Sequence, residues 1–443
     1  MPLGLFLVAL ALQAPQTPTQ VVQAAFDATA KRDWHRLSEL VDSVRLKKFR
    51  DTNLGMLVEW AQRRDEIAAS EKGFGFYGID SLTPQMIAAS KDVRLPAFGE
   101  TIGRLAAFSS QEFFIRWSAA ADRNGWDPTE ESSEAKRELV GELRMGDTLA
   151  YVIYRHDIRS VTDSVLCIDL PGQPMVMPLK KVSGRWRLLL NDDVGSAGYV
   201  FSLLPIPDPL PHWDASKLRR VTRLKPAPPL PPGASAPRRG PAQVTAAAFD
   251  ALMRADWKAL ATLVHPNMLA HFKREEMDFI IAWAQDKQSG SPAAAGGIHL
   301  MIHPAGEDTL TEPDIGSVAG IRVPVFRDSA TVGQLAATTP EQFFVLWCEA
   351  LYGNPAATDT SWAHENKSRR VLGTVLEGQT LAHVLYSGGP YTFDDKWRVS
   401  RMPLMRTADD WGLLLNDDIG ERTILGARLM MIDHPEVMGE PPP

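Results

Sequence analysis

The sequence is poor in several features that would narrow its class. It holds only two cysteines in 443 residues, so disulfides cannot hold the fold together and stability must come from a packed core. No internal apolar run reaches the ~18 residues that a membrane-spanning helix needs. A net charge of −7 is modest and argues against nucleic acid as the main partner.

The sequence does contain an internal repeat. Residues 177–195 return as residues 402–420 with 11 of 19 positions identical, and residues 20–41 return as residues 243–264 with 12 of 22 identical. A period above 200 residues is too long for a solenoid unit of ~20–50 residues and indicates a domain written twice. The cysteines do not follow the repeat, because Cys348 matches Ser118, so Cys167 and Cys348 could pair only between the two copies.

The repeat divides the chain into five parts. Residues 3–14 form a short apolar run of the length found in signal peptides, which predicts export to the periplasm or secretion. The alternative is the frayed N-terminal tail of a cytoplasmic protein. The predicted parts are the signal or N-terminal segment 1–16, module 1 at 17–203, a linker at 204–240, module 2 at 241–428 and a tail at 429–443.

The linker is rich in proline and in positive charge. The segment from Pro205 to Pro241 holds 11 of the 33 prolines, which favours an extended, semi-rigid spacer. Its seven Lys and Arg residues could contact an anionic surface, although a solvated linker is the simpler interpretation.

Each module is predicted to be α+β, with helices first and about four antiparallel strands last. Thr17 and Gln20 form a capping box for a first helix, and Asp33 caps a second. Residues 71–108 are expected to be rich in loops, with some short strand. Hairpins are predicted at residues 137–156 and 370–386. Eight of the 12 tryptophans match between the copies, which indicates core positions rather than a ligand platform.

These features resemble the NTF2-like superfamily. The resemblance rests on a helix ending in Phe-Asp-Ala, the following Asp-Trp-x-x-Leu-x-x-Leu-Val segment and the final strand Trp-x-Leu-Leu-Leu. It implies a curved sheet wrapped around helices with an apolar pocket beneath it. Enzymes of this superfamily, such as ketosteroid isomerases and small dehydratases, place an acid–base pair in that pocket. No such pair can be assigned in this sequence residue by residue.

Several motifs resemble cofactor or metal sites, but the sequence around them does not support assigning a site to any of them. Residues 73–78 match G-x-G-x-x-G but lack the strand before and the helix after that dinucleotide binding requires. His299 and His303 lack the glutamate of a zinc-protease motif, so no metal site and no cofactor is predicted. His265 at a helix junction matches Asp42 and suits a capping or surface role.

The polar residues most alike in the two copies follow the last strand. Asn191-Asp192-Asp193 and Asn416-Asp417-Asp418 could offer oxygen ligands to a cation, but are better explained as a stop that bonds its own backbone. Tyr154 and Tyr386 occupy matching strand positions and could point into a pocket, although core packing is the simpler interpretation.

The sequence therefore favours a non-catalytic binding or interaction protein of the cell envelope or secreted space. Linked copies raise avidity without new contacts, which suits a binder. The alternative is an enzyme acting on a small apolar molecule. The partner is expected to be such a molecule or an envelope protein.

Overall fold

The computed structural model describes residues 17–69, 82–124, 137–156, 174–191, 194, 229–289, 312–326, 329–353, 369–388, 399–416, 419 and 429. The chain divides into two compact units, and the described residues up to 194 belong to the first and those from 229 to the second. Both units combine helices with an antiparallel sheet, so the α+β prediction is confirmed.

The described elements of the first unit begin with helices and end with a four-stranded sheet. Its helices are α2 (Pro18–Ala30), α3 (Trp34–Leu40), α4 (Ser43–Ala69), α5 (Pro84–Ser90), α6 (Ile102–Ala106) and α7 (Ser110–Asn124). Its strands are the short pair β1 (Arg94–Leu95) and β2 (Glu100–Thr101), then β3 (Arg137–Met145), β4 (Leu149–His156), β5 (Met175–Val182) and β6 (Arg185–Leu188).

The second unit follows the same order. Its helices are α9 (Pro241–Met253), α10 (Trp257–Ala261), α11 (Pro266–Ser289), α12 (Glu312–Val318), α13 (Val332–Ala336) and α14 (Pro340–Leu351). Its strands are β7 (Arg370–Glu377), β8 (Leu381–Ser387), β9 (Ser400–Arg406) and β10 (Trp411–Leu413). An isolated bridge between Arg322 and Thr331 stands where the first unit has β1 and β2.

The two large sheets match in detail. Their strand orders are β3-β4-β5-β6 and β7-β8-β9-β10, with all neighbours antiparallel. The first hairpin of each carries one irregularity in its register, between Leu139 and Gly141 in one sheet and between Val371 and Gly373 in the other. A bulge at the same place in both sheets bends the first strand in the same way.

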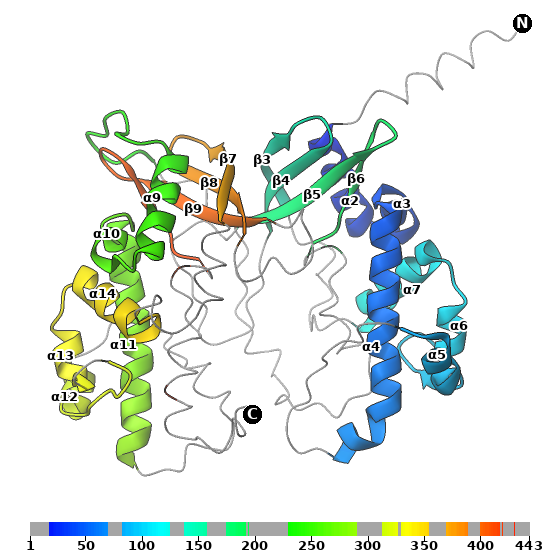
Figure 1. Cartoon of the computed structure of the whole chain (residues 1–443), viewed down its shortest axis with the longest axis horizontal. Coiled ribbons are helices and arrows are strands. Elements are labelled where there is room, and N and C mark those ends of the chain that lie inside the picture. Colours follow the sequence, from blue (N-terminus) through cyan, green and yellow to red (C-terminus); the bar gives the residue numbers. More distant parts are fainter. Residues whose placement is uncertain are drawn as a thin grey trace, which may run out of the picture. The chain divides into compact units, whose positions relative to one another are not determined.

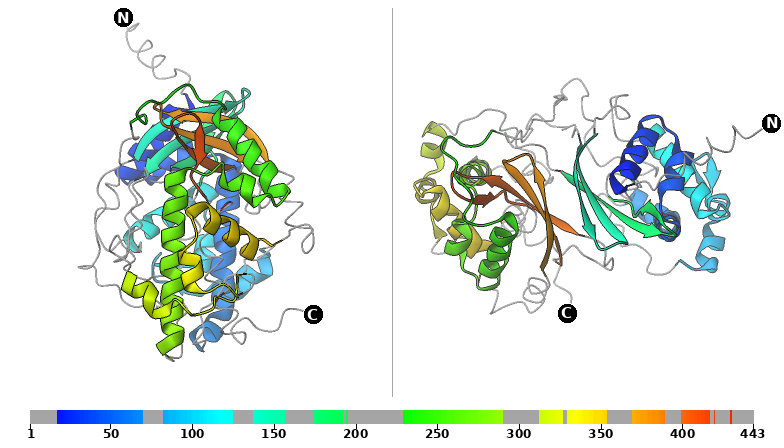
Figure 2. Two further views of the ribbon diagram at one scale, coloured as in Figure 1. Left: turned by 90° about the vertical axis from the view of Figure 1, so that its left-hand side faces the viewer. Right: turned by 90° about the horizontal axis from the view of Figure 1, so that it is seen from above.

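The helices of each unit lie to one side of its sheet (Figure 2). Within the first unit, α2 packs on β3, β4 and β6, whereas α4 runs away from the sheet and carries α5, α6 and α7 along its length (Figure 1). Within the second unit, α9 packs on β7, β8 and β10, and α11 carries α12, α13 and α14. Each unit thus has a sheet part and a helical part, joined by one long helix.

The local signals read from the sequence mostly act as predicted. Thr17 and Gln20 form both hydrogen bonds of a capping box, and Asp33 accepts a hydrogen bond from the backbone of Arg36. Both predicted hairpins are present. The described part of residues 71–108 contains the expected short strand, as β1 and β2, but also the helices α5 and α6, which the sequence did not indicate. Thr83 and Thr101 cap these two helices. The helices are too short to show helical periodicity in the sequence.

The matched tryptophans belong to the cores, as predicted. Trp186 and Trp411 are 7% and 6% exposed, and each faces a cation on the neighbouring strand. The two tryptophans that begin α3 and α10 differ in burial, because Trp257 is buried whereas Trp34 is half-buried at the edge of its core. Seven of the eight matched tryptophans are buried: Trp60, Trp117, Trp186, Trp257, Trp283, Trp347 and Trp411.

Candidate functional site

The space between each sheet and its helices is the first place to look for a site, because the NTF2-like resemblance implies a pocket there. In the first unit Tyr154 on β4 points into this space, where it is fully buried and packs against Phe26 of α2 with 4.8 Å between ring centroids. In the second unit Tyr386 and Phe249 repeat the contact, again at 4.8 Å. Core packing is therefore the role of both tyrosines.

The hydroxyl group of each buried tyrosine is held by the asparagine that follows the last strand. The Asn191 amide donates to the Tyr154 hydroxyl at 2.8 Å and to the Val176 carbonyl at 3.0 Å, while its side-chain oxygen accepts from Val194. Asn416 repeats all three contacts with Tyr386, Arg401 and Ile419. Asn191 and Asn416 each bond the backbone three residues on, as expected of a structural stop, and also reach the neighbouring strand.

Several residues considered as possible site residues lie in segments that the structure does not describe. Asp192, Asp193, Asp417 and Asp418 lie outside the described residues, as do the glycine-rich segment 73–78, His299, His303 and Cys167. Among the described residues, no three His, Cys, Asp or Glu side chains gather closely enough to hold a metal ion. Cys348 is a free thiol, fully buried in α14, where burial and the charge of Glu349 raise its pKa.

His265 caps a helix, as predicted, although it is buried rather than on the surface. Its Nδ1 accepts a hydrogen bond from the backbone of Asn267 at 3.2 Å, at the start of α11. Asp42 does the same for α4 by accepting from Val44 and Arg45. Burial lowers the pKa of His265, and a hydrogen bond to the backbone of Arg406 offsets this in part. The imidazole is therefore neutral at neutral pH.

The sequence did not indicate a buried polar cluster on the second sheet. The cluster lies on the face opposite to the one from which Tyr386 projects. His383 is 2% exposed, and its Nε2 lies 2.9 Å from a carboxylate oxygen of Glu377. Its Nδ1 lies 3.5 Å from a guanidinium nitrogen of Arg401. Arginine can only donate, so Nδ1 accepts and Nε2 carries the proton toward Glu377. With both nitrogens engaged, the ring is poorly placed to exchange protons with a substrate.

The first sheet has no counterpart of this cluster. Strand pairing places Tyr151 where the second sheet has His383, since Tyr151 pairs with Leu143 and His383 with Val375 at corresponding registers. By the same comparison Met145 matches Glu377 and Val176 matches Arg401. No short motif marks the cluster in the sequence; only the period-two alternation of β8 could place His383 on a sheet face.

One pocket lies in the helical part of the first unit, between the β1–β2 turn and α7. Its volume is about 210 Å³, below the ~300–1,000 Å³ of typical ligand sites. Glu112 and Arg116 on its wall pair with each other at 2.9 Å, and Glu100 and Arg123 complete its polar lining. In α14 of the second unit, Gln342 and Leu346 occupy the positions of this ion pair.

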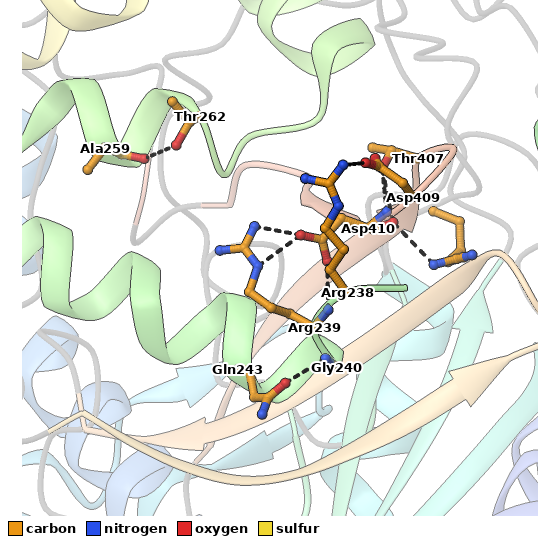
Figure 3. Close-up of polar contacts among 10 residues, drawn as sticks. Arg238, Arg239, Gly240, Gln243, Ala259, Thr262, Thr407, Asp409 and Asp410 are labelled. Carbon is orange, nitrogen blue, oxygen red and sulfur yellow. Dashed lines mark hydrogen bonds and ion pairs between the residues drawn. The ribbon is translucent and has the colours of Figure 1, made fainter. Parts of the chain in front are cut away.

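The most extended set of polar contacts joins the end of the linker to the β9–β10 turn of the second unit (Figure 3). Arg239 donates two side-chain hydrogen bonds to one oxygen of Asp410, at 2.8 and 2.6 Å, and its backbone donates to the other at 3.2 Å. Arg238 pairs with Asp409 both through side chains and through a backbone bond of 3.0 Å. Residues 235–239 therefore form a strap bound to the hairpin, rather than a solvated spacer.

Electrostatics favour this strap. Burial raises the pKa of Asp410, but hydrogen bonds from Arg239 and the Trp411 backbone and the Arg239 charge outweigh it, and the net pKa lies below the usual value. Arg406 adds a hydrogen bond to the carbonyl of Ser235. The sequence contains the pairs Arg238-Arg239 and Asp409-Asp410, which are absent from the matching places of the first copy, but it does not show that they meet.

The helices were also considered as membrane spans, and the chain was compared with known proteins. None of the described helices combines the length and apolar character needed to cross a membrane. Comparison of the chain with protein-family models, with curated proteins and with solved structures finds no match.

Proposed function

We propose that this chain is a non-catalytic binding protein built from two NTF2-like modules, 17–203 and 241–428, that acts in the cell envelope or secreted space. The module assignment is supported by the shared element order and by the matching sheets, each with a bulge in its first strand. The localisation rests on the apolar run at residues 3–14, which lies outside the described residues.

The observation that carries the non-catalytic role is the buried aromatic contact beneath each sheet. An enzyme of the proposed superfamily needs an open apolar cavity with a convergent acid–base pair. Here Phe26 and Tyr154 occupy that space in one unit and Phe249 and Tyr386 in the other, and each hydroxyl group is already bonded to an asparagine. A tyrosine that is buried against a phenylalanine and accepts a hydrogen bond from an asparagine contributes to the core, which supports a structural rather than a reactive role.

The test is whether the chain takes up and activates a small apolar carbonyl compound. We would titrate the purified protein with a steroidal ketone, follow tryptophan fluorescence, and record exchange of the ketone's α-protons in D₂O by NMR. The expected result is neither saturable binding nor catalysed exchange. Saturable exchange that disappears in Tyr154→Phe or Tyr386→Phe would overturn the proposal in favour of the enzyme.

A further inference from the structure

The β5–β6 hairpin of the first unit carries an unbalanced positive charge. Residues 175–188 contain two Lys and two Arg and no Asp or Glu, for a net charge of +4, in a chain whose net charge is −7. The corresponding residues 400–413 contain two Arg and two Asp, for a net charge of 0. The two hairpins share fold and register, so the fold itself does not require the excess charge.

The cations that distinguish the first hairpin share one face. Lys180 pairs with Arg187 across the strands, and Val182 pairs with Arg185, so these side chains project from the same side of the sheet. We call Lys180, Arg185 and Arg187 the basic patch. At the same register the second unit has Met405, Asp410 and Gly412. The remaining cation, Lys181, faces Trp186 just as Arg406 faces Trp411, and therefore has a structural role in both units.

The basic patch is expected to destabilise the free protein. Like charges directly opposite on neighbouring strands destabilise a sheet, and Lys180 and Arg187 are such a pair. One N–H of Arg187 donates to the Glu39 carbonyl, which carries no full charge. Lys180 and Arg185 are exposed, and among the described residues neither forms an ion pair, including with Asp147 on the neighbouring turn. Val182 stands exposed between them, at 37%.

The second unit shows what this end of the hairpin can hold. There the strap of residues 235–239 is bound by backbone hydrogen bonds from Ser235 and Arg238 to the turn, and by the ion pair from Arg239 to Asp410. Arg185 stands where the second unit has Asp410, so the charge at this position is inverted. The complement of Arg185 is a carboxylate, which a guanidinium can bind through two parallel hydrogen bonds.

We propose that the basic patch of the first unit is a docking surface for an extended acidic peptide segment of a partner protein. Arg185 and Arg187 lie two residues apart on one strand, about 7 Å along its axis, and the carboxylates of an extended chain recur with the same spacing. The preferred partner therefore carries acidic residues at alternate positions. The inference deepens the proposed binding role and rests on it, because it names the chemistry of one partner.

The test measures binding of synthetic peptides by fluorescence anisotropy with the full chain. The probe is a short labelled peptide in which glutamate alternates with serine; the comparisons are a peptide of the same composition with its glutamates contiguous and one with glutamine in place of glutamate. Vesicles of phosphatidylglycerol and phosphatidylcholine test anionic lipid. The variant Lys180→Met with Arg185→Asp carries the residues that the second unit uses at these places, so we expect it to fold.

The matched control removes the same three units of charge elsewhere, through Lys31→Met, Lys48→Met and Lys258→Met at exposed positions. We expect the alternating peptide to bind the native chain and the control equally, and to bind the hairpin variant at least about tenfold more weakly, because charge-assisted hydrogen bonds are lost. A melting temperature of the variant that is equal to or above that of the native chain excludes misfolding, since the variant removes like charges that destabilise the sheet.

Several results would overturn the inference. Equal binding of the contiguous peptide, or equal losses in the variant and the control, would mean non-specific attraction to net charge. Binding of vesicles without binding of the alternating peptide would assign the basic patch to a lipid surface, and binding of neither would remove the site. None of these outcomes affects the ketone test, so failure of the docking surface and failure of the non-catalytic role remain distinguishable.

Discussion

Asn191 and Tyr154 are joined by a hydrogen bond of 2.8 Å that ties the end of the last strand to the buried centre of the sheet. Asn416 and Tyr386 repeat it at 3.1 Å in the second unit. The asparagine also bonds a carbonyl on the neighbouring strand and a backbone N–H three residues on. One asparagine side chain thus connects the end of the last strand to the neighbouring strand, to the buried tyrosine and to the backbone of the following turn.

The first prediction concerns this pair. Asn191→Ala should lower the free energy of unfolding by about 1–3 kcal/mol, because it removes the three side-chain hydrogen bonds of Asn191 to the Tyr154 hydroxyl, the Val176 carbonyl and the Val194 backbone. Tyr154→Phe should cost less, about 0.5–1.5 kcal/mol, because it leaves the bonds of Asn191 to Val176 and Val194 in place. Urea unfolding of both variants and of Asn416→Ala and Tyr386→Phe measures the order. A cost for Tyr154→Phe above that for Asn191→Ala would contradict the assigned roles.

The second prediction concerns the tryptophans of the last strands. Trp186→Ala and Trp411→Ala should each cost about 3–5 kcal/mol, as large truncations in a core do. Trp34→Ala serves as comparison, since Trp34 is half-buried and its loss should cost less than that of Trp257. Losses under about 1 kcal/mol for Trp186 and Trp411 would place them outside the core and restore the ligand-platform interpretation.

The third prediction concerns pH. The folded-state pKa of His265 lies below the unfolded value of about 6.5, so the unfolded chain binds more protons and stability falls on acidification. The contribution of His265 is fully present above about pH 6.5 and is lost as the pH falls through the folded-state pKa. His265→Asn keeps a capping side chain without the titration. Its unfolding free energy should change less than the native value between pH 7 and 5; identical slopes would refute the assignment.

The fourth prediction concerns the strap. Asp410→Asn removes the charge that holds Arg239, and trypsin should then cleave after Arg238 or Arg239 several times faster, because the strap opens more often. Asp409→Asn is the control, as the Arg238–Asp409 pair is more exposed and contributes less. High salt should raise the native cleavage rate toward that of Asp410→Asn. Cleavage rates that do not depend on Asp410 would show that the backbone bonds suffice.

The fifth prediction concerns the contact of β10 with the start of α11. A Cβ at Gly412 would lie 2.6 Å from the Cα of His265, so Gly412→Ala must push the strand from the helix. Overpacking of this kind costs about 1–3 kcal/mol. The first unit supplies the control, since Arg187 already occupies the matching place and Arg187→Ala should leave this contact intact. Equal tolerance of both changes, measured by thermal unfolding, would mean that the second contact is loose.

The sequence by itself predicted the repeat, the α+β class, the capping residues Thr17 and Asp33, the first hairpin of each sheet and the burial of Trp186 and Trp411. These follow from local signals: a capping side chain bonds a backbone group three residues away, and alternation of apolar residues defines a strand face. The internal copy strengthened them, since residues kept in both copies at matching places are those that both cores need.

Other features were decided by tertiary structure alone. The sequence could not place the asparagine of the strand stop against Tyr154, because the two are far apart in the chain and meet only when the sheet closes. The same holds for His383 with Arg401 and for Arg239 with Asp410, 171 residues apart. Such contacts depend on strand register and on which face each side chain takes, and a shift of one residue would reverse the face. Local sequence patterns specify the elements, whereas the pairing of distant polar groups is specified only by the folded sheet.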